Sequence, residues 1–91
     1  MPPLPSKPHN VFKGRMEHLP VVSGRETVLA FKQAEWVLQR RSKKGHFILG
    51  KPSVFFKLSI PDHKKLDRGL LDSLIKDAGL TIPEFRKLLE S

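Results

Sequence analysis

Apolar residues after position 23 recur every three to four positions, which is the pattern of an amphipathic helix. Val28, Phe31 and Ala34 would share one face of this helix. Ser23 and Glu26 precede them and form a capping box, in which each side chain accepts a hydrogen bond from the backbone N–H of the other residue. The sequence therefore predicts a helix that begins at Ser23 and ends near Ala34.

The next part of the chain has the composition of strands. Residues 36–41 and 47–49 are rich in strand-forming side chains, and Gly45 between them suits the loop of a hairpin. Residues 54–60 alternate apolar and polar positions, so we expect a third strand there that ends at Pro61. We expect Phe47 and Leu49 to face the helices, and His46 to face outward.

Two further helices are predicted near the C-terminus. Asp67 can cap the first helix, Gly79 suits a left-handed stop, and its apolar stripe consists of Leu70, Leu71, Leu74, Ile75 and Ala78. Thr81 and Glu84 form a second capping box at the start of a short helix, with Phe85, Leu88 and Leu89 inward.

The predicted order is therefore helix, three antiparallel strands, helix and short helix, which makes an α+β domain of two layers. We expect the core to include Phe31, Trp36, Phe56, Leu58, Ile60 and the Leu70 stripe. Residues 1–18 hold four prolines within the first eight positions and several basic residues, so we expect a flexible N-terminal arm there and the domain over residues 19–91.

Charge is the feature of the composition that bears on function. The chain has 17 Lys and Arg against 9 Asp and Glu, so its net charge is +8 and a polyanion or an acidic protein is the expected partner. The absence of Cys excludes disulfides and thiol catalysis and is compatible with the cytoplasm, where we expect the protein. No segment is apolar enough for a membrane span or a secretion signal.

His46 is the first candidate for catalysis. It stands between a run of cations and an apolar strand, and an imidazole titrates near neutral pH, as a general base that activates the 2′-OH of RNA must. The alternative is a polar residue at a strand end with no catalytic role. His63 is a second candidate, as proton donor or phosphate ligand, or as a structural residue of its connector.

Cations close to these histidines are the candidate phosphate contacts. Four lie on the predicted hairpin and two follow the third strand: Arg40, Arg41, Lys43, Lys44, Lys64 and Lys65. Asp62, His63 and Asp67 lack the spacing of metal ligands, so we expect no metal and no cofactor.

Four segments together resemble the HicA (YcfA-like) family of mRNA interferase toxins. They are residues 19–26, the Gly-His and three apolar residues of 45–49, residues 60–64 and residues 69–80. The resemblance implies a fold like the double-stranded-RNA-binding domain, metal-independent cleavage of mRNA by one histidine, which falls on His46, and neutralisation by an acidic HicB-like antitoxin.

The sequence departs from the family pattern at three places. The Gly-Ser before the family's histidine is Lys44-Gly45, in a loop one residue longer. The usual glycine after the first helix is Glu35, which would cost about 1 kcal/mol if the position needs positive φ. The usual Gly-Thr-Leu entry to the second long helix is residues 69–71, Gly-Leu-Leu.

Two other functions are compatible with the sequence. One is an RNA-binding module of the same fold that does not cut RNA. The other is a basic structural protein of a large ribonucleoprotein.

Overall fold

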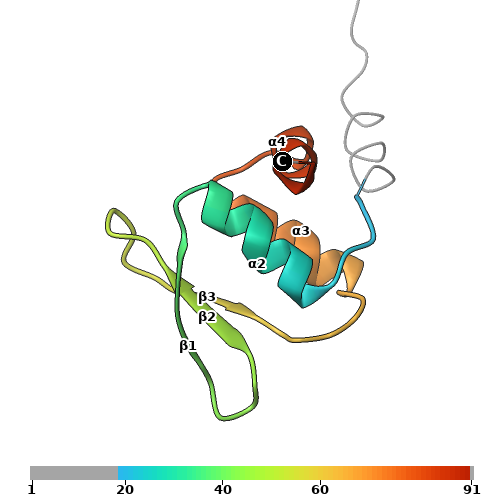
Figure 1. The fold of residues 1–91 in the computed structure, drawn as a ribbon. Helices are drawn as coiled ribbons and strands as arrows, with labels where there is room; N and C mark the ends of the chain where they lie inside the picture. Colours follow the sequence, from blue (N-terminus) through green and yellow to red (C-terminus); the bar gives the residue numbers. More distant parts are fainter. Residues whose placement is uncertain (1–18, 91) are drawn as a thin grey trace, which may run out of the picture.

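The computed structural model describes residues 19–90, which form a three-stranded sheet with helices on one side (Figure 1). The elements follow in the order α2 (Gly24–Gln33), β1 (Val37–Arg41), β2 (Phe47–Gly50), β3 (Leu58–Ile60), α3 (Arg68–Asp77) and α4 (Ile82–Leu89). The predicted α+β class and the order α-β-β-β-α with a short C-terminal helix are confirmed. The predicted arm over residues 1–18 lies outside the described residues.

The helices begin where their capping residues predict. Ser23 and Glu26 form both hydrogen bonds of a capping box at α2, with Oγ of Ser23 3.0 Å from the Glu26 amide. Thr81 and Glu84 form the same box at α4, and the Asp67 carboxylate accepts a hydrogen bond from the Leu70 amide at α3. Each cap satisfies an amide that the first helical turn leaves without a partner.

The sheet is antiparallel in the order β1-β2-β3. Phe47 pairs with Arg41 on one side and with Ile60 on the other, and the pairing of β1 with β2 shifts register between Leu38 and Arg40. The β1–β2 and β2–β3 hairpin loops therefore lie at opposite ends of β2 (Figure 1).

The two faces of the sheet differ in chemistry. Phe47 and Leu49 are buried against the helices, at 7% and 0% exposure, as the sequence predicts. Ile48 is only partly buried, and its direct partners across the sheet are Arg40 and Ser59. Since paired residues share a face, these three side chains lie on the face opposite the helices.

The third strand is shorter than predicted. It covers Leu58–Ile60, whereas residues 51–57 form a loop in which the Val54 amide donates to the Lys51 carbonyl over 3.0 Å. β2 ends at Gly50 and its last pair with β3 is Leu49 with Leu58, so β2 offers no partner that would hold residues 54–57 in the sheet. The prediction that Phe56 belongs to the core is wrong, because its side chain is 50% exposed.

The core lies between the sheet and helices α2 and α3, with α4 packed on the helices. The Phe31 ring of α2 meets the Phe85 ring of α4 edge to face at 5.6 Å, and both rings are fully buried. Trp36 is also buried, and its indole N–H donates to the Ala78 carbonyl over 3.4 Å. Among the described residues, no helix is long and apolar enough to cross a membrane.

The start of α2 is joined directly to the segment after β3. The Gly24 amide donates to the His63 carbonyl over 2.9 Å, and the Leu66 amide donates to the Val22 carbonyl over 2.8 Å. A side chain at position 24 would place its Cβ only 1.9 Å from the Pro61 carbonyl oxygen, so this close approach requires glycine. The junction fixes where Asp62 and His63 lie relative to α2.

Candidate functional site

His46 lies at the end of a closed hairpin turn. The Ser42 amide donates to the His46 carbonyl and the Gly45 amide donates to the Ser42 carbonyl, both over 2.8 Å. The His46 amide in turn donates to Oγ of Ser42 over 3.1 Å. Gly45 has a φ of +86°, which suits glycine at the last position of a three-residue hairpin loop. The turn therefore fixes the backbone of His46 and leaves Lys43 and Lys44 exposed at its tip.

The imidazole of His46 has one fixed nitrogen. Its Nδ1 lies 3.1 Å from the hydroxyl oxygen of Ser59 on β3, and the residue is partly buried. A hydrogen bond at one ring nitrogen fixes the orientation of the ring, and with Nδ1 as the donor to the Ser59 hydroxyl, Nε2 carries the lone pair. Nε2 of His46 is then the nitrogen left for a ligand. Ser59 was not among the predicted site residues, although the alternation of residues 54–60 already placed it on the polar face of its strand.

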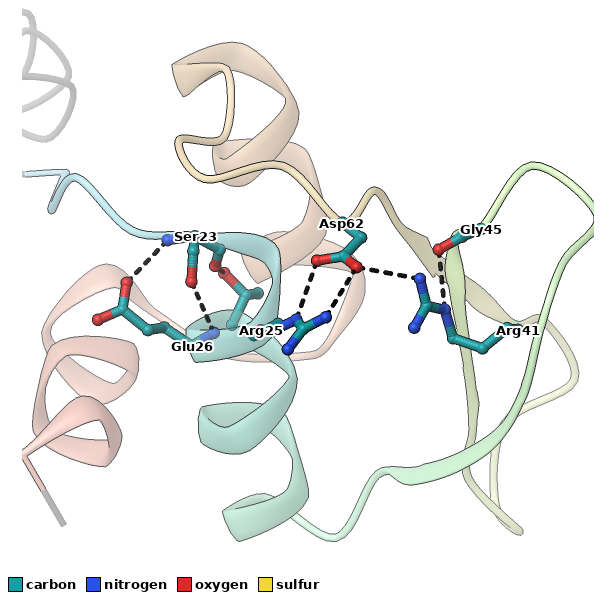
Figure 2. A network of polar contacts seen from close by, with 7 residues as sticks. Ser23, Arg25, Glu26, Arg41, Gly45 and Asp62 are labelled. Carbon is teal, nitrogen blue, oxygen red and sulfur yellow. Dashed lines mark hydrogen bonds and ion pairs between the residues drawn. The ribbon is translucent and has the colours of Figure 1, made fainter.

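A second feature is an aspartate held between two arginines (Figure 2). Asp62 accepts from Arg25 over 3.2 and 3.3 Å and from Arg41 over 3.0 Å. The hydrogen bond from Arg25 is the main cause that holds the pKa of Asp62 below its ordinary value, and the same contact raises the pKa of Arg25. Asp62 is therefore a carboxylate whose charge is neutralised by the protein itself.

This network connects the hairpin turn to the start of α2. Nε of Arg41 donates to the Gly45 carbonyl over 2.9 Å (Figure 2). The Arg41 guanidinium also lies 4.3 Å from the centre of the Phe47 ring. Arg41 was predicted to contact phosphate, and the structure shows that two of its donors are already used within the protein. Arg25 was not predicted as a site residue. It lies in the segment 19–26 that carries the family resemblance, which was the available signal.

His63 and Lys64 line a shallow hollow beside this network. Its volume is about 440 Å³, and its other lining residues are Ser23, Arg25 and Asp62. His46 and Lys65 do not line it. The structure therefore places the two candidate histidines at separate positions, with Arg25, Asp62 and Arg41 joining the hollow to the turn that carries His46.

The charge of the sheet is of one sign. Residues 36–61 contain six Lys or Arg and no Asp or Glu. Arg40, Lys43 and Lys44 are exposed and form no ion pair with any residue in the range 19–90. The first carboxylate after the sheet is Asp62, which the two arginines neutralise. In the part of the chain that the structure describes, no three His, Asp or Glu side chains group as they would around a metal ion.

A comparison with protein-family models matches residues 24–80 to the HicA toxin of bacterial toxin–antitoxin systems. The chain belongs to the HicA toxin family. The matched range contains the hairpin turn with His46, the Asp62 network and both long helices, and only α4 lies beyond it. Searches of curated proteins and of solved structures found no match. Membership assigns this HicA-family chain to the toxin side of a toxin–antitoxin pair and implies an antitoxin partner.

Proposed function

We propose that this HicA-family protein is a metal-independent endoribonuclease that cleaves mRNA with His46 as its general base. The observation that supports this proposal most is the imidazole held at Nδ1 by Ser59 on a surface whose unpaired charges are cationic. Metal-free RNA cleavage requires a general base and nearby cations that bind the phosphodiester. His46 has a fixed ring with one available nitrogen, and cations lie next to it.

The reaction proposed is transfer of the phosphoryl group to the neighbouring 2′-oxygen. Nε2 of His46 accepts the proton of the 2′-OH while that oxygen bonds to phosphorus. The bond from phosphorus to the 5′-oxygen breaks, and this oxygen takes a proton. The products are a 2′,3′-cyclic phosphate and a 5′-OH end. His63 is the secondary candidate, either as this proton donor or as a phosphate ligand in the hollow beside Asp62.

The cations have the proposed role of holding the RNA backbone. Arg40, Lys43 and Lys44 are the hairpin contacts, and Lys64 and Lys65 extend the surface beyond β3. Arg41 has a double role in this proposal, because it also fixes the turn through Gly45 and Asp62. Such contacts position a strand without reading its bases. The same cationic surface suits an acidic, HicB-like antitoxin, whose binding would exclude RNA in the cytoplasm.

The decisive experiment is incubation of the purified protein with RNA in the presence of EDTA. We expect products that end in 2′,3′-cyclic phosphate, and we expect His46→Ala to lower the rate by about 10² to 10⁴, the usual contribution of a general base. His63→Ala tests the secondary candidate, and we expect a smaller loss from it. RNA that is bound but stays intact would instead show the non-catalytic RNA-binding module, and cleavage that survives His46→Ala would refute the assignment of the base.

Ser59 is proposed as a positioning residue that acts through His46. Ser59→Ala should lower kcat with little change in KM and should shift the pH dependence of kcat/KM, because the hydrogen bond at Nδ1 is lost. Ser59→Thr retains the hydroxyl and should restore most of the rate. If Ser59 had only a structural role, Ser59→Ala would leave the pH dependence of kcat/KM unchanged.

A further inference from the structure

The loop between β2 and β3 exposes an aromatic side chain completely. Phe55 is 105% exposed, more than any other large apolar residue described. It belongs to the loop of residues 51–57 between β2 and β3, which projects beyond the sheet in Figure 1. Burying a phenylalanine side chain stabilises a folded protein, so the exposure of Phe55 forgoes that stabilisation. The face of such an exposed ring is available for stacking with a ligand.

The base of this loop is fixed against the domain. The Phe56 ring lies 6.2 Å from the buried Trp36 ring at a 40° tilt, and Nζ of Lys51 lies 5.6 Å from the centre of Trp36. The Val54 amide donates to the Lys51 carbonyl over 3.0 Å. Because Phe56 is held by Trp36, its neighbour Phe55 is presented to solvent from an anchored loop.

The surroundings of Phe55 identify the chemistry of the ligand. Lys51 and Lys57 flank the loop, and the whole of residues 36–61 has no carboxylate. The other phenylalanine of the loop, Phe56, is half covered and lies on Trp36, so Phe55 is the one fully exposed ring among the described residues. A single fully exposed ring suits a flat partner that needs only one face, and every nucleic-acid base has such a face. Protein docking usually relies on a larger contiguous apolar surface. A cationic surface with one exposed ring therefore favours single-stranded nucleic acid over an apolar protein partner.

We propose that Phe55 stacks on an unpaired base of the RNA, with Lys51 and Lys57 contacting the phosphates on either side. This inference rests on the RNA-cleaving function proposed above and adds a second contact to it. Lys51 lies five positions after His46, at the other end of β2, which corresponds to about 17 Å of extended chain. The stacked base then belongs to a nucleotide several positions away from the cleaved bond, so this contact selects single-stranded over paired substrate.

The test measures binding in the His46→Ala background, where the RNA stays intact. A labelled single-stranded RNA of about ten nucleotides, and an abasic strand of equal length, are titrated by fluorescence anisotropy at one fixed salt concentration. We expect Phe55→Ala to weaken binding of the normal RNA by about 5- to 150-fold, the range measured for loss of one stacked base, and to leave the affinity for the abasic strand within about 2-fold.

Phe55→Trp should retain affinity for the normal RNA. Phe55→Leu, which keeps the apolar surface without the ring, should behave like Phe55→Ala. Val21→Ala, at a residue 68% exposed before α2, is the matched control and should change nothing.

The outcomes separate this inference from the proposed function. If the protein with Phe55 intact binds RNA and Phe55→Ala binds it equally well, stacking is refuted while the nuclease proposal stands. Equal weakening on the normal and abasic strands also refutes stacking, because the ring would then act on the fold. If Phe55→Ala weakens only the antitoxin complex, the ring is a protein contact. If the protein with Phe55 intact binds no RNA at low salt, both proposals fail together.

Discussion

Helices α2 and α3 end in the same backbone motif but with different residues at its left-handed position. After α2, the Trp36 amide donates to the Phe31 carbonyl and the Glu35 amide to the Lys32 carbonyl, both over 3.0 Å. After α3, the amides of Leu80 and Gly79 make the corresponding bonds, so both ends are Schellman motifs. The left-handed residue is Gly79 with φ +81° in one motif and Glu35 with φ +73° in the other. Position 35 does require the positive φ that the family's glycine supplies.

We predict that Glu35→Gly stabilises the protein. A side chain in the left-handed region costs about 1–2 kcal/mol, and the greater freedom of glycine in the unfolded chain returns about 0.4–1 kcal/mol of this. The free energy of unfolding should rise by about 0.5–1 kcal/mol. For a domain of this size such a gain raises Tm by about 2–8 °C.

The assay is urea unfolding followed by the fluorescence of Trp36, the only tryptophan, which is buried next to the mutated position. The midpoint should rise with an unchanged slope, since the surface exposed on unfolding is the same. Glu35→Ala is the control that removes the carboxylate while keeping a side chain in the left-handed region, so it should gain much less. Gly79→Ala should lose about 1 kcal/mol, because a Cβ there meets no atom within 4 Å and the whole cost is conformational. An unchanged or lower stability of Glu35→Gly would refute this reasoning.

Three further predictions concern the site. Gly24→Ala should destabilise the protein by about 1–3 kcal/mol in the same urea assay, since its Cβ would meet the Pro61 carbonyl at 1.9 Å; a neutral effect would show that the junction can move. Because the folded pKa of Asp62 lies below the ordinary value of 3.8, its contribution to stability is present above pH 3.8 and is lost as the pH falls through the folded value. Asp62→Asn should therefore flatten the acid limb of stability against pH and slow RNA cleavage without weakening RNA binding, and an unchanged acid limb would contradict the ion-pair network. The logarithm of RNA affinity should fall against the logarithm of salt concentration with a slope of roughly −3 if about four phosphates are neutralised, and a slope near zero in the anisotropy titration would exclude the cationic surface as the binding face.

The parts of the fold set by local rules were predictable. Ser23 with Glu26, and Thr81 with Glu84, fix helix starts through residues three positions apart, so no knowledge of the rest of the chain was needed. The orientation of β2 was predicted correctly, with Phe47 and Leu49 on the face that the helices cover, although Ile48 on the other face is also apolar. The length of β3 was not, since the alternation of residues 54–60 continues past the point at which β2 provides partners.

The residue types of the site were predictable from the sequence, but the hydrogen bonds between its side chains were not. His46 and the hairpin cations stand next to one another in the sequence, so their proximity required no folding. The contact of His46 with Ser59 and that of Arg25 with Asp62 join residues 13 and 37 positions apart. Both depend on sheet register and on the close approach at Gly24, which a single sequence does not give.

The turn before His46 shows how a departure from the family pattern can still fix the position of the histidine proposed as the base. Gly45 occupies the backbone position with φ +86°, and a residue with a Cβ there would be strained. The hydroxyl that accepts the hydrogen bond from the His46 amide belongs to Ser42, at the opposite end of the loop. Lys43 and Lys44 are then free to vary, because neither side chain makes a contact within the described turn, and in this chain they add two cations beside the proposed base. The additional residue of the loop therefore lengthens the cationic tip while Ser42, Gly45 and Arg41 hold the geometry of His46.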